Sequence, residues 1–283
     1  MKTEAFAKIN LTLDITGRLE NGYHSLFTVM HLVSCADVIG TEKRTDGRIV
    51  LSANKEYIPL DEKNTCHKAA RLFFDMLGSC PGCDIKIENR VPSGAGLGNS
   101  SADAAAVLKN LNELFGFPFS DEELLKRSVE IGADVPFCFA GGTRLCLGTG
   151  EIMRALPAFD LPVIIVKPEI SFPTAGAYAR YDEKEANGKI IHPDNAAFLS
   201  FAEKGDWLSA LKFASNVFEQ IQPETQISAI KTALIQNGAV YSAMSGSGSA
   251  VFGVFDRAAS AEYLSSVAAS LSTPGTFTSV CLP

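Results

Sequence analysis

Residues 92–106 constrain the fold of this chain more than any other stretch, because closely spaced glycines lead there into a strong helix former. Glycine allows positive φ and a close approach of the backbone to a ligand. The alanines that follow favour a helix, which Ser100 or Ser101 could cap. A glycine loop that enters a helix N-terminus presents unpaired N–H groups to an anion. The stretch therefore predicts a phosphate site and a nucleotide-binding protein.

The same stretch excludes the commoner phosphate-binding motifs. A Walker loop requires a lysine after its last glycine, and the dinucleotide fingerprint requires a glycine where Asn99 stands. The Gly98-x-Ser100-x-Ala102 spacing approaches a hydrolase nucleophile elbow, but no strongly apolar parallel strand precedes it. The H-R-D and D-F-G sequences of protein kinases do not occur. A purely structural loop with small residues for close helix packing remains open at this point.

Composition indicates an ordinary globular protein. The 283 residues suffice for one large domain or two of ordinary size, and 46% of them are apolar and 20% charged. A formal net charge of −7 without a basic cluster argues against a nucleic-acid partner. The N-terminus lacks the apolar region of a signal peptide, and no apolar run approaches the ~20 residues of a membrane span. We expect a cytoplasmic protein with no membrane partner.

Seven cysteines, an odd number, fit reduced thiols in a cytosolic protein. Cys80 and Cys83 form a C-x-x-C, but a zinc ribbon would need a second such pair. A thioredoxin-like site would need a βαβ pattern that begins just upstream, whereas this pair follows a helix in a Gly/Pro turn. We therefore predict no metal or redox role for it, and the four histidines show no metal-ligand spacing either.

The N-terminal half alternates apolar and polar residues as β-strands do, with helical spacing in between. Strands are predicted over residues 5–15, 25–33, 38–43, 49–53 and 83–91, and helices over 65–77 and 102–115. Ser120-Asp-Glu-Glu123 is a capping box that opens a further helix, which we end at Gly132.

The second half predicts strands over 161–167, 240–244, 250–255 and 277–282, with helices within 173–236, notably 207–221 and 225–236, and over 258–271. This order of β, helices, β, β, α, β is that of a ferredoxin-like sandwich. A Pro-rich segment near Ala158 separates the two halves, so we predict domains at residues 1–157 and 158–283.

Four separated stretches carry side chains that a hydrophobic core alone does not explain. They are A-K-I-N-L at 7–11 with G-Y-H at 22–24, the glycine loop, G-A-D-V-P at 132–136, and S-G-S-G-S-A at 245–250. Lys8 is unusual on a strand unless it points at a cleft, since lysine is rarely buried unpaired. Asp134 stands where a helical turn could begin, so a helix cap and a catalytic carboxylate are both open from this residue alone.

Taken together, these stretches resemble the GHMP small-molecule kinases, named for galactokinase, homoserine kinase, mevalonate kinase and phosphomevalonate kinase. The A-K-I-N-L and G-Y-H pair, G-A-D-V-P, and I-x-F-P-T at 170–174 resemble the members that phosphorylate the 2-hydroxyl of 4-diphosphocytidyl-2-C-methyl-D-erythritol in the non-mevalonate isoprenoid precursor pathway. The resemblance runs from about Phe6 to Phe255.

The resemblance implies an α+β protein with the two-domain GHMP-kinase fold. The N-terminal domain would be a mixed sheet with helices that contains a left-handed βαβ crossover, against the usual rule. The C-terminal domain would be a ferredoxin-like α/β sandwich, and the active site would lie in the cleft between the domains. ATP and Mg²⁺ are the implied cosubstrate and metal.

Roles follow from the resemblance residue by residue. Lys8 and Asp134 match the catalytic pair: Asp134 would accept the proton of the attacking hydroxyl, while Lys8 would keep that carboxylate ionised and stabilise the transferring phosphoryl group. The substrate side matches Asn10, Tyr23, His24, Thr174 and Tyr178. The ATP side matches Pro92, Ser93, Gly94, Ala95, Gly96, Leu97, Gly98, Asn99, Ser100 and Ser101, with Asn64 and Asn89 at the adenine. Ser101 is also the candidate metal ligand.

The loop departs from the family's usual G-L-G-G-G-S, because Asn99 and Ser100 replace two glycines. Asparagine tolerates the left-handed region, so we expect Asn99 to keep the loop shape and Ser100 to disturb it. Restoring glycine at both positions would then tighten ATP binding.

Two other functions stay open. A GHMP kinase could act on homoserine or a mevalonate-like alcohol, but Tyr23, His24 and Tyr178 suit a substrate with a flat base. A non-catalytic ligand sensor on the same fold would have no use for Lys8 and Asp134. We expect small-molecule partners, no nucleic acid, and a monomer or homodimer.

Overall fold

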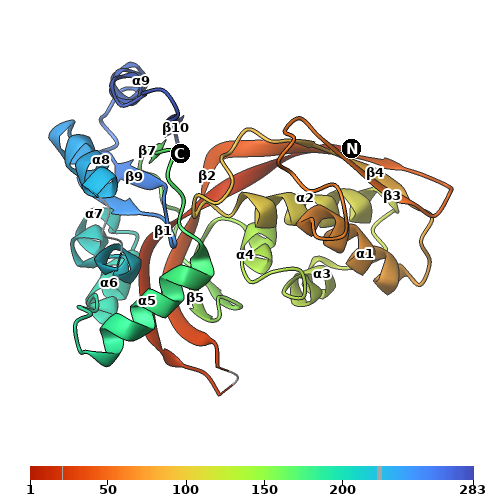
Figure 1. Ribbon diagram of the computed structural model, residues 1–283, viewed down its shortest axis with the longest axis horizontal. Helices are drawn as coiled ribbons and strands as arrows, with labels where there is room; N and C mark the ends of the chain where they lie inside the picture. The colour runs from red at the N-terminus through yellow and green to blue at the C-terminus, as the bar shows by residue number, and fades with distance from the viewer. Residues whose placement is uncertain (21, 222–224) are drawn as a thin grey trace. The chain divides into compact units, whose positions relative to one another are not determined.

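The computed structural model describes residues 1–20, 22–221 and 225–283, and Asn21, which precedes the G-Y-H element, lies outside them. The chain forms two compact units that interleave along the sequence (Figure 1). Unit 1 comprises Met1–Ala7, Ala36–Ser93 and Gly98–Gly141, and unit 2 comprises Lys8–Cys35, Gly94–Leu97 and Gly142–Pro283. The domain boundary at 157/158 therefore stays a prediction.

Unit 1 contains a βαβ element. Strand β3 (Ile49–Ala53) runs parallel to β4 (Cys83–Glu88), and helix α1 (Thr65–Leu77) connects them. Strand β4 also pairs antiparallel with the C-terminal part of β2 (His24–Lys43). The predicted bounds of α1 are confirmed: the Asn64 side chain caps its start, and Gly78 ends it at a φ of 70°. The hand of the crossover stays a prediction.

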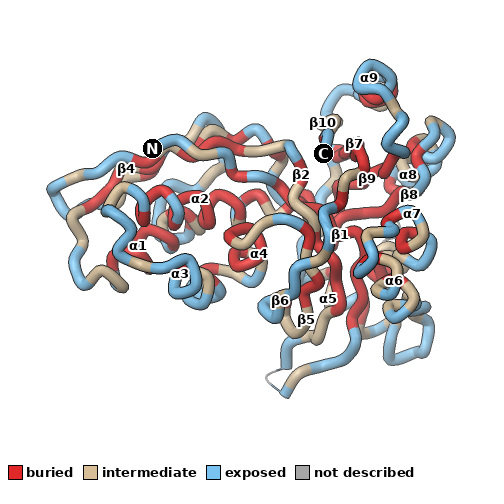
Figure 2. The backbone as a smooth tube through the Cα atoms, turned by 180° about the vertical axis from the view of Figure 1, so that it is seen from behind, coloured by how far each residue is buried: buried red, intermediate tan, exposed pale blue. Residues whose placement is uncertain are grey.

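Helices α1 and α2 (Asn99–Leu114) pack together, and α4 (Val135–Ala140) contacts both α2 and α3 (Asp121–Ser128). Figure 2 shows the buried sides of α1 and α2 in red. An aromatic cluster of Phe73, Phe74, Phe115 and Phe119 joins α1 to the end of α2, with ring centroids 5.4–5.7 Å apart. The capping box at Ser120 is confirmed, but α3 ends at Ser128 rather than Gly132.

Unit 2 contains a four-stranded antiparallel sheet in the order β10-β7-β9-β8. Its strands are β7 (Val163–Lys167), β8 (Tyr241–Met244), β9 (Val251–Val254) and β10 (Phe277–Cys281). Helix α8 (Thr225–Gln236) packs on β8 and β9, and α9 (Ala261–Ser270) on β7 and β10. This order confirms the ferredoxin-like sandwich, and every residue of β7 and β9 is buried (Figure 2).

Strand β1 (Lys2–Arg18), whose residues from Lys8 onward belong to unit 2, pairs with β2. The N-terminal part of β2 pairs with β5 (Thr143–Gly148), and β5 pairs with β6 (Ile152–Ala155). The prediction of two strands at 25–33 and 38–43 was wrong. The chain instead forms one strand of 20 residues, because its first part pairs with β5 and its second part with β4.

The predicted helix over 207–221 was also wrong. Unit 2 has α5 (Thr174–Ala186), α6 (Asn195–Ala202) and the short α7 (Trp207–Ala210), followed by 3₁₀ helices at Leu211–Phe213 and Val217–Gln220. Between them the backbone leaves the helix so that Ser215 O accepts from Leu13 N at 2.8 Å. The Asn216 side chain donates to Met244 O and Gly246 O, both at 2.7 Å. These long-range bonds outweigh local helix propensity.

Candidate active site

The glycine loop turns through positive φ at each of its glycines: 64° at Gly94, 76° at Gly96 and 66° at Gly98. Gly98 is the N-cap of α2, and its carbonyl accepts from Ser101 N at 3.0 Å and Ala102 N at 2.9 Å. The prediction that Ser100 or Ser101 caps this helix was wrong. The two amides before these, those of Asn99 and Ser100, lack intrahelical acceptors and lie at the positive end of the helix dipole, which suits an anion.

The expectation that Asn99 and Ser100 occupy glycine-like positions was wrong as well. Both lie in the first turn of α2, and Phe117 is the one non-glycine residue with positive φ in the part of the chain that the structure describes. Asn99 Nδ2 donates to Ser93 Oγ at 3.3 Å, and Ser100 O accepts from Thr65 Oγ1 at 2.7 Å. The helix begins at Asn99, so neither residue needs a left-handed conformation.

The middle of the glycine loop is fastened on two sides within unit 2. On one side Leu97 O accepts from Lys8 N at 2.8 Å. On the other side Gly96 O accepts from Ser245 Oγ at 2.8 Å, and Ala95 O accepts from Ala250 N at 3.0 Å. A Cβ on Gly96 would lie 2.0 Å from Ser245 O, so only glycine allows this contact. Three of the four stretches singled out in the sequence therefore meet.

Lys8 and Asn10 belong to a buried polar chain. Lys8 Nζ donates to Asn10 Oδ1 at 2.7 Å, and Asn10 Nδ2 donates to Thr28 Oγ1 at 2.8 Å. Because the Thr28 hydroxyl donates its proton to Thr12 O at 2.7 Å, it must accept from the amide. This fixes the Asn10 side-chain amide with its oxygen toward the Lys8 ammonium. The hydrogen bond between them offsets part of the cost of burying the lysine. Sequence reasoning missed Thr28, although a threonine within an apolar strand was a usable signal.

One face of α5 presents the predicted substrate residues at helical spacing. Thr174, Tyr178 and Asp182 recur every four residues, so their side chains lie above one another. Thr174 Oγ1 lies 3.0 Å from Ser247 Oγ. The Tyr178 ring stacks on His24 with centroids 4.7 Å apart and planes 22° apart. Tyr23, at 65% exposure, projects to the surface.

Asp182 is a residue that the sequence reasoning missed, although it continues the spacing of Thr174 and Tyr178. Its Oδ1 lies 2.8 Å from His24 Nε2, and its Oδ2 accepts from Arg18. Burial raises the pKa of Asp182, but the hydrogen bond that it accepts from His24 and the contact with Arg18 outweigh burial, so the pKa is lowered. Asp182 is thus an ionised acceptor at neutral pH.

A cavity of about 710 Å³ in unit 2 lies beside this pair, within the usual range for small-molecule pockets. The end of β1, the C-terminal half of α5, His24 and His192 line it. His24 is thereby a predicted substrate residue in the wall of a cavity of ligand size.

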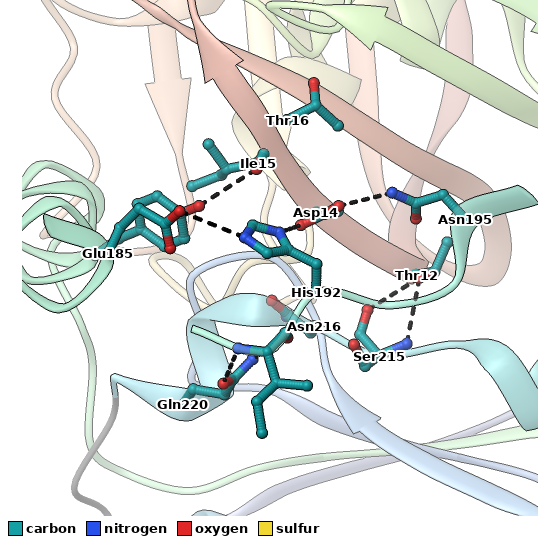
Figure 3. Close-up of polar contacts among 12 residues, drawn as sticks. Thr12, Asp14, Ile15, Thr16, Glu185, His192, Asn195, Ser215, Asn216 and Gln220 are labelled. Carbon is teal, nitrogen blue, oxygen red and sulfur yellow. Dashed lines mark hydrogen bonds and ion pairs between the residues drawn. The ribbon is translucent and has the colours of Figure 1, made fainter. Parts of the chain in front are cut away.

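Figure 3 shows the polar contacts around Asp14, next to this cavity. The Asp14 side chain is 4% exposed and accepts from His192 Nδ1 at 2.7 Å and Asn195 Nδ2 at 2.6 Å. The second ring nitrogen of His192 lies 3.5 Å from Glu185 Oε1. The hydrogen bond that His192 donates to Asp14 raises the pKa of His192, although partial burial opposes this shift. These contacts fasten the segment between α5 and α6 to β1.

In unit 1, Asp134 occupies the N-cap position of α4, yet its side chain makes no capping hydrogen bond to the described helix. The two predicted adenine residues are engaged by the protein. Asn64 accepts from Cys66 N at 2.8 Å, and Asn89 Nδ2 donates to Asp37 Oδ2 at 2.9 Å. Their adenine role stays a prediction.

A buried carboxyl pair supports the strand that leads into the glycine loop. Asp37 is fully buried and accepts from Arg90 N at 2.5 Å and Val91 N at 2.7 Å. Burial and the charge of Asp37 hold the pKa of Asp103 far above its usual range, so Asp103 is protonated. A neutral Asp103 avoids the cost of burying an uncompensated charge.

Cys80 and Cys83 are free thiols, and residues 1–20, 22–221 and 225–283 contain no group of three or more His, Cys, Asp or Glu side chains placed to hold a metal ion. Over the same ranges, no helix has the length and apolar character to cross a membrane.

Comparisons with known proteins agree with this fold. Residues 64–142 match the GHMP kinases N terminal domain, and residues 198–272 match the GHMP kinases C terminal domain. The chain belongs to the GHMP kinase family, so it is an ATP-dependent small-molecule kinase.

Two similar curated proteins carry the same name. A 4-diphosphocytidyl-2-C-methyl-D-erythritol kinase from Syntrophomonas wolfei is 41% identical over 89% of this chain and 88% of its own. A second, from Caldicellulosiruptor bescii, is 39% identical over 90% and 89%. The crystal structure of a 4-(cytidine 5'-diphospho)-2C-methyl-D-erythritol kinase is 27% identical, with a TM-score of 0.80 over the full length of both chains. Methanococcus jannaschii mevalonate kinase, 16% identical with a TM-score of 0.77, shares the fold.

Proposed function

We propose that this protein transfers the γ-phosphoryl group of ATP to the 2-hydroxyl of 4-diphosphocytidyl-2-C-methyl-D-erythritol, a step of the non-mevalonate isoprenoid pathway. One observation carries the proposal: within unit 2, the glycine loop is bonded both to the strand that bears Lys8 and to the Ser245–Ala250 turn. The relatives named for this activity support the choice of substrate.

The reaction needs positioning, charge neutralisation and one proton acceptor. The 2-hydroxyl oxygen attacks the γ-phosphorus, the bond from that phosphorus to the bridging oxygen of ADP breaks, and Asp134 takes the hydroxyl proton. Lys8 stabilises the negative charge on the transferring group. Asn10 orients the Lys8 ammonium through the bond to its amide oxygen. General-base catalysis by a positioned carboxylate contributes about 10²–10⁴-fold.

ATP binds with its phosphates against the backbone of residues 92–101. Mg²⁺, which would neutralise charge on the phosphates, would be held mainly by those phosphates, because this ion needs few protein ligands. The Ser101 hydroxyl, a hard oxygen donor in the first turn of α2, fits such a site. Asn64 and Asn89 border the adenine, and their amides, already bonded within the protein, shape the pocket wall.

The cytosine base binds against Tyr23 and Tyr178. A centroid separation of 4.7 Å exceeds the contact distance of about 3.5–4.0 Å between stacked carbon atoms. The His24 and Tyr178 rings are therefore offset, which leaves part of the tyrosine face beyond the imidazole. A base over that part of the ring has its edge toward His24.

An ATP-consumption assay with purified substrates tests the proposal. We expect turnover with 4-diphosphocytidyl-2-C-methyl-D-erythritol and none above background with homoserine or mevalonate. Equal or greater kcat/KM with either alcohol would assign the chain to another GHMP kinase activity. Binding of the cytidine compound without ATP consumption would instead indicate a ligand sensor.

The catalytic pair is tested by Asp134→Asn and Lys8→Ala, each of which should lower kcat by roughly two or more orders of magnitude. Asp121→Asn at the exposed start of α3 and Lys86→Ala on the exposed face of β4 are matched controls that should retain wild-type kcat. If the catalytic variants have native circular dichroism and near wild-type kcat, the assignment is wrong.

A further inference from the structure

We propose that Asp182 is a positioning residue that makes the enzyme selective for cytosine over uracil, by holding a proton on Nε2 of His24. The inference rests on the proposed function, because it concerns the base of that substrate. It assigns to Asp182, on α5, a role in setting which ring nitrogen of His24 donates a hydrogen bond and which accepts one.

The geometry around His24 confines the ring on three sides. Its Nε2 lies 2.8 Å from Asp182 Oδ1, its face stacks on Tyr178, and Tyr181 meets it edge-on with centroids 6.1 Å apart. The His24 side chain is 12% exposed, so it does not rotate freely in solvent. Arg18 holds the second oxygen of Asp182 and thereby fixes the carboxylate.

Hydrogen-bond chemistry then determines the tautomer. An ionised carboxylate only accepts, so His24 Nε2 must be the donor. In neutral imidazole the other nitrogen, Nδ1, is consequently an acceptor. A histidine without this partner could exchange the two roles, so Asp182 makes His24 an acceptor at the nitrogen that is left for a ligand.

An acceptor at this position distinguishes the two pyrimidines. Cytosine carries an amino group at C4, which donates to Nδ1, whereas uracil carries a carbonyl oxygen there, which repels it. An unpaired buried polar group makes the uridine compound bind less well by roughly ten- to a hundredfold. Stacking on Tyr178 adds affinity but tolerates either base.

Asp182→Asn changes the tautomer with little change in shape. The guanidinium of Arg18 is a donor only and bears a charge, so it claims the single amide oxygen. The amide NH₂ then faces His24 and turns Nε2 into an acceptor. Arg18→Ala combined with Asp182→Asn frees the amide oxygen for Nε2–H and restores the original tautomer.

The first measurement is ¹⁵N NMR of the histidine ring nitrogens at pH 8, with His24 assigned from the spectrum of His24→Gln. We expect the Nε2–H form in the unaltered enzyme, the Nδ1–H form in Asp182→Asn, and the Nε2–H form again in the double variant. An unaltered enzyme with the Nδ1–H form would overturn the proposal without any assay of activity.

The second measurement is kcat/KM with the cytidine substrate and its uridine analogue. Asp182→Asn should reduce the cytidine-to-uridine ratio about tenfold or more, through KM rather than kcat, and the double variant should recover most of it. Glu183→Gln, which removes a charge from the neighbouring exposed position of α5, should leave the ratio unchanged.

Failures of the two proposals are distinguishable. No turnover of either compound by the unaltered enzyme refutes the proposed function. Turnover with an unchanged ratio in Asp182→Asn refutes the role of Asp182 and leaves the proposed function standing. Native melting temperatures in all variants exclude a general loss of structure.

Discussion

Replacing Gly96 with alanine should separate the glycine loop from the Ser245–Ala250 turn. The new Cβ would lie 2.0 Å from Ser245 O and 2.9 Å from its carbonyl carbon, both backbone atoms that cannot rotate away. The left-handed φ of 76° adds about 1–2 kcal/mol for any L-residue. Loss of the bonds from Ser245 Oγ and Ala250 N adds about 0.5–1.5 kcal/mol each. We expect a destabilisation of about 2–5 kcal/mol in all.

Gly94→Ala is the matched control, because it places the same methyl group two residues earlier at a φ of 64°. The nearest atom to its Cβ is Ser171 Oγ at 4.0 Å, an ordinary contact. This variant therefore carries the cost of the backbone conformation alone, about 1–2 kcal/mol. The difference between the two variants isolates the close approach at Gly96.

Urea denaturation followed by circular dichroism measures the free energy of unfolding, and steady-state kinetics measure KM for ATP. Gly96→Ala should be the less stable variant by about 1–3 kcal/mol and should raise KM for ATP further than Gly94→Ala does. Equal losses of stability and of ATP affinity would refute the reasoning, since they would mean that Gly96 does not touch the turn.

Two further predictions concern His192 and Asn99. The folded protein raises the pKa of His192, so its pair with Asp14 contributes fully to the free energy of unfolding below the unfolded pKa near 6.5. That contribution is lost as the pH rises through the raised pKa of the folded state. The stability difference between the wild type and His192→Gln, on the order of 1 kcal/mol, should therefore be larger at pH 6 than at pH 9 in thermal denaturation. Asn99→Gly removes the bond to Ser93 Oγ and adds a glycine to the first turn of α2, so it should destabilise the protein by about 1 kcal/mol and leave KM for ATP unimproved. Tighter ATP binding by that variant would contradict the helical placement of Asn99.

Local patterns predicted the elements whose signals are complete within a short window. The bounds of α1 and α8 agree with the prediction to the residue, because apolar spacing and the Asn64 cap are local signals. The order of strands and helices after residue 160 was enough to identify the ferredoxin-like sheet, since few topologies satisfy that order. The motifs around Lys8, the glycine loop and Asp134 identified the family because each motif is complete within a few consecutive residues.

Tertiary contacts decided what no window contains. β2 is one strand rather than two because different strands pair with its two parts, and the helix expected at 207–221 breaks where Ser215 and Asn216 bond to distant backbone. The partner of His24 lies 158 residues away on α5, and the turn that requires glycine at position 96 lies 149 residues away. Sequence determines local propensity and residue chemistry, but hydrogen bonds and close contacts between distant residues exist only once the chain has folded. Only those contacts therefore revealed the roles of Asp182 and Thr28 and the need for glycine at position 96.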